Sequence, residues 1–110
     1  KTLAATAVTM VLSGHALASE LRFAQRPVDG QYIVVLKDQA ASLAGEFRAT
    51  NAPSVASVAN SIASQHKAQV TRSYNSVLRG FVVKANAKQV AQMLNDSRIA
   101  YIEEDGYVYA

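Results

Sequence analysis

Residues 79–102 are RGFVVKANAKQVAQMLNDSRIAYI, and this stretch predicts a strand, a helix and a second strand. Arg79–Lys84 is a short run with an aromatic residue and two valines after Gly80, which is typical of a strand. Asn86 is a good helix N-cap, and Gln89 stands where it closes a capping box, so we expect a helix over Ala87–Asn95. The last four letters, IAYI, predict the second strand. The stretch is therefore a β-α-β unit.

The residues before this stretch predict a second unit of the same kind. Tyr32–Lys37 is a β-branched run that predicts a strand. Val55–His66 has apolar residues at helical spacing, and Asn51 or Ser54 is its expected N-cap. Gln69–Tyr74 alternates as a half-buried strand does.

The predicted elements follow the order β-α-β-β-α-β over residues 31–105. This is the order of the ferredoxin-like split β-α-β-β-α-β arrangement. We therefore expect an α+β domain with a four-stranded antiparallel sheet and two helices on one face. Residues 19–30 are polar and contain Pro27 and Gly30, so they are expected to form a leader. Because this fold carries many functions, the function must be argued from particular residues.

The N-terminal residues 1–18 have the three-part layout of a secretory signal peptide. A positive first residue precedes an uncharged run of small and apolar residues. Ala16 and Ala18 then form a small-x-small cleavage site before Ser19. The uncharged run is near the lower length limit of a membrane span, but its small residues and the cleavage site favour a signal over an anchor. We expect cleavage after Ala18 and a secreted, extracellular chain with no membrane attachment afterwards.

The composition bounds the remaining possibilities. A length of 110 residues suits one domain, and half of them are hydrophobic, so a core is feasible. The net charge of +3 is too small to argue for nucleic acid by itself. The chain has no Cys, which excludes disulfides, thiolate metal sites and Cys nucleophiles.

The titratable residues predict neither catalysis nor a metal site. A Ser-His-Asp system needs a histidine that shuttles protons, and His66 alone remains after signal removal, at the end of a predicted helix. Glu103, Glu104 and Asp105 are adjacent on an extended chain, so Glu103 and Asp105 share one side and Glu104 faces the other. A solvated acidic cluster is favoured there over a weak calcium contact. We expect no enzyme activity, no metal and no cofactor.

Nucleic-acid binding is the sharper alternative, because a common RNA-binding module has this same topology. Its signature strand is K/R-G-F/Y-G/A-F-V-x-F/Y. Arg79–Phe81 fits the opening of that pattern, whereas Val82–Lys84 breaks it and the stacking aromatics are missing. We therefore expect no nucleic-acid partner.

The C-terminal residues carry a family resemblance. Ala100–Asp105 resembles the end of the propeptide of secreted subtilisin-like serine proteases, the peptidase inhibitor I9 family, in which a hydrophobic strand is followed by E-x-D and a short tail. Tyr32–Lys37 is similar to that family's first strand, and Val70–Asn75 and Leu78–Lys84 are similar to its central hairpin. The resemblance covers residues 31–110.

This resemblance implies a partner, the catalytic domain of a subtilisin-like serine protease. It implies that Glu103 and Asp105 accept hydrogen bonds at the N-termini of two protease helices, where carboxylates are favoured. It also implies that Gly106–Ala110 forms an extended tail in the protease cleft and stays there after self-cleavage. The residues implied to fill successive subsites are Tyr107, Val108, Tyr109 and Ala110.

The function implied is that of a propeptide region in a secreted zymogen, acting as intramolecular chaperone and as temporary inhibitor. On this interpretation the chain is a fragment of a subtilisin-like endopeptidase precursor, and the catalytic domain follows Ala110. The alternative is a free-standing secreted inhibitor of the same family. The coding sequence after Ala110 distinguishes the two, because only the precursor continues into a protease.

Overall fold

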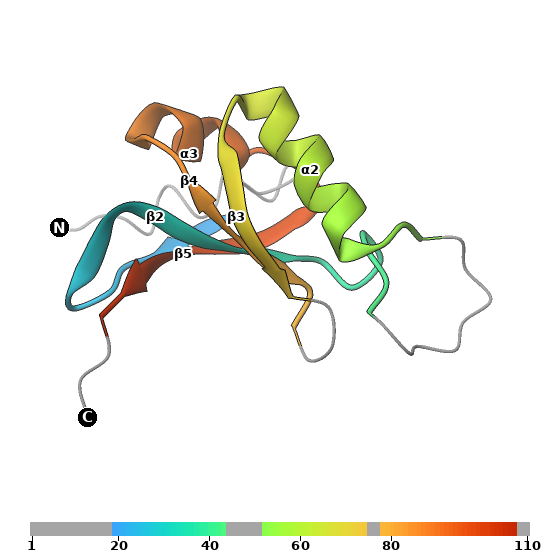
Figure 1. Ribbon diagram of the computed structural model, residues 1–110, viewed down its shortest axis with the longest axis horizontal. Coiled ribbons are helices and arrows are strands. Elements are labelled where there is room, and N and C mark those ends of the chain that lie inside the picture. The colour runs from blue at the N-terminus through green and yellow to red at the C-terminus, as the bar shows by residue number, and fades with distance from the viewer. Residues whose placement is uncertain (1–18, 44–51, 75–77, 108–110) are drawn as a thin grey trace, which may run out of the picture.

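The computed structural model describes residues 19–43, 52–74 and 78–107, which form one sheet with two helices (Figure 1). The elements in chain order are β1 (Glu20–Arg22), β2 (Pro27–Leu36), α2 (Val55–His66), β3 (Gln69–Tyr74), β4 (Gly80–Lys84), α3 (Ala87–Met93) and β5 (Ile99–Gly106). The strand order across the sheet is β1-β5-β2-β4-β3. The α+β class predicted from the sequence is confirmed. The predicted signal peptide, residues 1–18, lies outside the described residues.

The prediction of a four-stranded antiparallel sheet is wrong, because the sheet is five-stranded and mixed. Strands β5, β2, β4 and β3 pair antiparallel, but β1 pairs with β5 in parallel. β1 lies in the segment expected to be a leader. Leu21 packs against the core beside Ile102, its register partner. β1 also pairs with the outer edge of β5, whose backbone groups need partners.

Strand β2 also starts earlier than expected, at Pro27 rather than Tyr32. Gly30 has a φ of 73°, in the left-handed region that favours glycine. The register between β2 and β5 shifts between Pro27 and Tyr32. The strand therefore continues through an irregularity that glycine permits.

Both helices begin where the sequence predicts. Ser54 is the N-cap of α2, and its side chain accepts a hydrogen bond from the backbone N–H of Ser57. Asn86 and Gln89 form the predicted capping box at the start of α3, each side chain bonding the other's backbone N–H at 2.8 Å. α3 ends at Met93, two residues before the expected end.

The core lies between the helices and one face of the sheet. Both helices cover the same face (Figure 1). The largest fully buried side chains are Phe81, Ile62, Met93, Ile99, Ile102, Val34, Val55 and Val83. Val34 and Ile102 are register partners within this core, so the residues on either side of them project from the opposite face. We call that opposite face the open face. Its members are Gln31, Ile33, Val35, Arg72, Tyr74, Val82, Tyr101, Glu103 and Asp105.

Candidate functional site

The three acidic residues at the end of β5 divide between the two faces of the sheet. Glu103 pairs in register with Ile33 and projects from the open face, as does Asp105. Glu104 turns the other way, and its Oε1 accepts a hydrogen bond of 2.9 Å from the backbone N–H of Ala24. This is the division that strand alternation predicts from the sequence. Two carboxylates are therefore presented on one surface, and the third is used within the domain.

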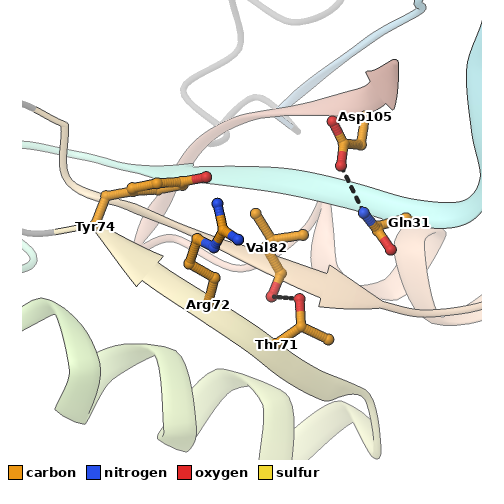
Figure 2. Close-up of a pocket in the computed structure, with 6 residues that line it drawn as sticks. All are labelled: Gln31, Thr71, Arg72, Tyr74, Val82 and Asp105. Carbon is orange, nitrogen blue, oxygen red and sulfur yellow. Dashed lines mark hydrogen bonds between the residues drawn. The ribbon is translucent and has the colours of Figure 1, made fainter. Parts of the chain in front are cut away.

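Asp105 is held in a fixed position. Its Oδ2 accepts a hydrogen bond of 2.6 Å from Nε2 of Gln31, and its Oδ1 accepts one of 2.9 Å from the backbone N–H of Gly106. Figure 2 shows the Asp105 carboxylate and the Gln31 amide pointing toward each other from adjacent strands. The carboxylate is thus oriented at the point where β5 ends.

A shallow pocket of about 290 Å³ adjoins Asp105 on the open face (Figure 2). The residues that line it are Gln31, Thr71, Arg72, Tyr74, Val82 and Asp105. They come from β2, β3, β4 and β5, so the pocket crosses the whole antiparallel part of the sheet. The sequence analysis did not identify Gln31, Arg72 or Tyr74, because only the strand order brings them into one pocket with Asp105.

The centre of the open face is apolar. Val35 and Val82 are only 9% and 6% exposed, although neither belongs to the core cluster under the helices. Ile33 lies beside them and is half-buried. At the edge, the guanidinium carbon of Arg22 lies 3.6 Å from the ring centroid of Tyr101. The face therefore combines an apolar centre with two carboxylates at one end.

The predicted tail leaves the domain at this same end. β5 ends at Gly106, and the side chain of Tyr107 is 59% exposed. The backbone N–H of Tyr107 donates to the carbonyl oxygen of Arg26 across 2.9 Å. The other predicted tail residues, Val108, Tyr109 and Ala110, lie outside the described residues.

A comparison with protein-family models identifies the family. The model of the peptidase inhibitor I9 family matches residues 31–110. The chain belongs to the peptidase inhibitor I9 family. This family comprises the propeptide domains of subtilisin-like proteases, and its members bind and inhibit those proteases. A comparison with curated proteins gave no match.

The family match has two consequences for the site. An I9 domain is an inhibitor domain rather than a catalytic one. The match begins at residue 31, so β1 and the turn that follows it lie outside the part that resembles the family. They are features of this chain that the family match does not explain.

The remaining polar cluster of the I9 domain supports the structure rather than catalysis. Asp96 accepts two hydrogen bonds from the guanidinium of Arg98, at 2.9 and 2.6 Å, and these hold the pKa of Asp96 below its ordinary value. His66 lies 3.8 Å from Asp96, and Ser61 accepts from Arg98 at 3.3 Å. Both carboxylate oxygens of Asp96 are thus bonded to Arg98. In a catalytic triad the aspartate would instead orient the histidine.

Two further findings concern the described part of the chain. Among those residues, no group of three or more His, Cys, Asp or Glu side chains is placed to hold a metal ion. Nor does either helix there have the length and apolar character needed to cross a membrane.

Proposed function

We propose that this chain is the propeptide region of a secreted subtilisin-like serine protease precursor, in which it assists folding of the protease and temporarily blocks its active site. One observation carries the proposal beyond the family. Glu103 and Asp105 project from the same apolar face, at the end where the chain leaves through Gly106 and Tyr107. A docking surface and an inhibitory tail are therefore contiguous.

In this proposal the open face packs on the protease surface. The half-buried side chains of Ile33, Tyr74 and Tyr101 surround the nearly buried Val35 and Val82, and they supply the apolar contact. Burial of that area is favourable at about 25 cal/mol per Å². Glu103 and Asp105 then accept hydrogen bonds from the N-termini of two protease helices. Each such contact contributes about 0.3–1 kcal/mol, and more when it is partly buried.

The tail Gly106–Ala110 then lies extended along the substrate cleft and adds a strand to the edge of the protease. The exposed Tyr107 enters the cleft region first, followed by Val108, Tyr109 and Ala110. After self-cleavage this segment remains as a bound product. Deletion of residues 106–110 is therefore expected to remove most of the inhibition by the chain from Ser19 onward. Unchanged inhibition by the shortened chain would rule out product blocking.

The chaperone part of the proposal follows from linkage. A domain that binds the folded protease but not the unfolded one stabilises the folded form. A denatured subtilisin-type protease is refolded with or without this domain, and its activity is measured after the domain has been digested. More activity should be recovered when the domain was present during refolding. Equal recovery with and without the domain would remove the chaperone role and leave the inhibitory role.

The secretory part of the proposal rests on residues 1–18 and on cleavage after Ala18, between Ala16-x-Ala18 and Ser19. I9 propeptides belong to secreted proteases, which supports it. The N-terminal residue of the exported chain, measured by mass spectrometry, should be Ser19. A different N-terminus would move the leader boundary.

A free-standing secreted I9 inhibitor is the second candidate function. It uses the same face and the same tail, but the protease is a separate chain. The coding sequence beyond Ala110 separates the two candidates, because a catalytic domain supports the precursor and a stop codon supports the inhibitor.

A further inference from the structure

The turn between β1 and β2 holds the start of the tail. The backbone N–H of Ala24 donates to Glu104 across 2.9 Å, and the carbonyl oxygen of Arg26 accepts from the N–H of Tyr107 across 2.9 Å. Pro27 is the register partner of Gly106. Figure 1 shows this turn beside the end of β5. We call residues 24–27 the leader clamp.

The clamp is anchored because the leader follows β5 along its length. At the far end, the N–H of Ser19 donates to the carbonyl of Leu94 at 2.8 Å, and its Oγ donates to the carbonyl of Ile99 at 2.7 Å. Between these ends, β1 pairs in parallel with residues 101–103. The leader is therefore fixed at Ser19, along β1 and at the tail exit.

Gly106 fits this clamp closely. A Cβ atom at this position would lie 3.0 Å from Cβ of Ala24 and 3.4 Å from the carbonyl oxygen of Arg26. The first of these distances is tighter than most Cβ contacts, so a larger residue here would require Ala24 to shift by a few tenths of an ångström. Glycine permits the close approach.

We propose that the leader clamp sets the direction in which the tail leaves the domain, and that Glu104 is its positioning residue. The inference rests on the proposed function, since the destination of the tail is the protease cleft. Binding an extended segment costs conformational entropy, and a segment whose first residues are already fixed loses less of it. The clamp thus strengthens inhibition without touching the protease. It also gives a role to Glu104, the acid that faces away from the docking surface.

The test is a double-mutant cycle on the chain from Ser19 onward. Glu104→Leu removes the acceptor for Ala24, and a second change ends the chain at Gly106. Dissociation constants are measured by calorimetry against a subtilisin-type protease whose nucleophilic serine is replaced by alanine. Glu104→Leu should weaken binding about tenfold in the full-length chain, residues 19–110, and less than about twofold in the shortened chain, residues 19–106. The reason is that positioning matters only when a tail is present.

Glu104→Gln is the matched control, since it keeps an acceptor oxygen and should bind within about twofold of the parent. Gly106→Ala is the second variant, and in the full-length chain it should weaken binding without loss of the folded far-UV spectrum. An equal effect of Glu104→Leu in both chain lengths, or no effect in the full-length chain, would overturn the proposal.

A second readout does not depend on the protease. In the free chain, hydrogen exchange at the Tyr107 amide should be slowed by its bond to Arg26 and should speed up at least about fivefold in Glu104→Leu. Unchanged exchange would overturn the clamp. If the parent chain inhibits no subtilisin-type protease but exchange responds as expected, then the proposed function fails and the clamp remains.

Discussion

Gln31 on β2 donates a hydrogen bond of 2.6 Å to Asp105 on β5, although the two residues are 74 positions apart in the chain. This bond orients the last acid of β5 before the tail begins. Gln31→Ala should therefore weaken inhibition about three- to tenfold by letting the carboxylate turn, with a change of less than about 0.5 kcal/mol in the free energy of unfolding. Gln31→Glu should weaken it further, because two carboxylates then repel. Inhibition titrations with urea unfolding check this, and equal inhibition by all three chains would contradict it.

The open face and the helix layer should respond differently to a new charge. Ile33→Lys places an ammonium group in the centre of the proposed interface, where burial without a partner is costly, so inhibition should weaken at least about a hundredfold. Asn60→Lys is the matched control, since Asn60 is exposed on α2 in the opposite layer. The control should inhibit as the parent does. If Asn60→Lys is the damaging change and Ile33→Lys is harmless, then the docking face has been assigned to the wrong layer.

The contact between Asp96 and Arg98 makes stability depend on acid pH. Because Arg98 lowers the pKa of Asp96 in the folded chain, the folded state binds a proton less readily than the unfolded state. The stabilisation by Asp96 is thus fully present above the ordinary pKa of 3.8. It is lost as the pH falls through the lower pKa that Asp96 has in the folded chain. Asp96→Asn should cost about 1–2 kcal/mol at pH 7.

Urea unfolding of the parent and Asp96→Asn at several pH values measures this dependence. The gap between their free energies of unfolding should narrow as the pH drops below 3.8. A gap that stays constant down to the lowest pH at which the chains fold would show that the carboxylate contributes nothing through its charge.

Gly80 lies where β4 approaches β2 closely. A Cβ atom there would lie 2.9 Å from the backbone oxygen of Val34, which cannot rotate away. Gly80→Ala should lower the free energy of unfolding by about 1–3 kcal/mol, as overpacking of a well-packed interior does. Asn60→Ala, on the exposed surface of α2, should change it by less than about 0.5 kcal/mol. Thermal or urea unfolding distinguishes these outcomes, and an equally small effect at both positions would contradict the close packing.

The elements whose signals are local were predictable from the sequence. α2 runs over Val55–His66 as its apolar spacing indicates, with the cap at Ser54, one of the two expected residues. The capping box at Asn86 and Gln89 likewise depends only on residues three apart. The division of the acids between two faces also followed, because alternation is a property of any extended strand.

The features that depend on long-range pairing were not predictable. β1 is three residues long and polar, and it forms because Leu21 reaches the core and the edge of β5 is available. The pocket beside Asp105 requires the strand order, and the register shift after Val70 decides which β3 side chains reach the open face. No short sequence window contains this information.

The central claim is that the open face and its two carboxylates dock on a subtilisin-type protease. It is tested most directly by the inhibition constant of the chain from Ser19 onward against such a protease, compared with that of the variant carrying Glu103→Ala and Asp105→Ala. Asp38→Ala, at the opposite end of the sheet and 91% exposed, is the control. We predict slow, tight inhibition by the parent and the control, and at least about tenfold weaker inhibition by the double variant. Full protease activity in the presence of the parent, or equal inhibition by all three chains, would contradict the claim.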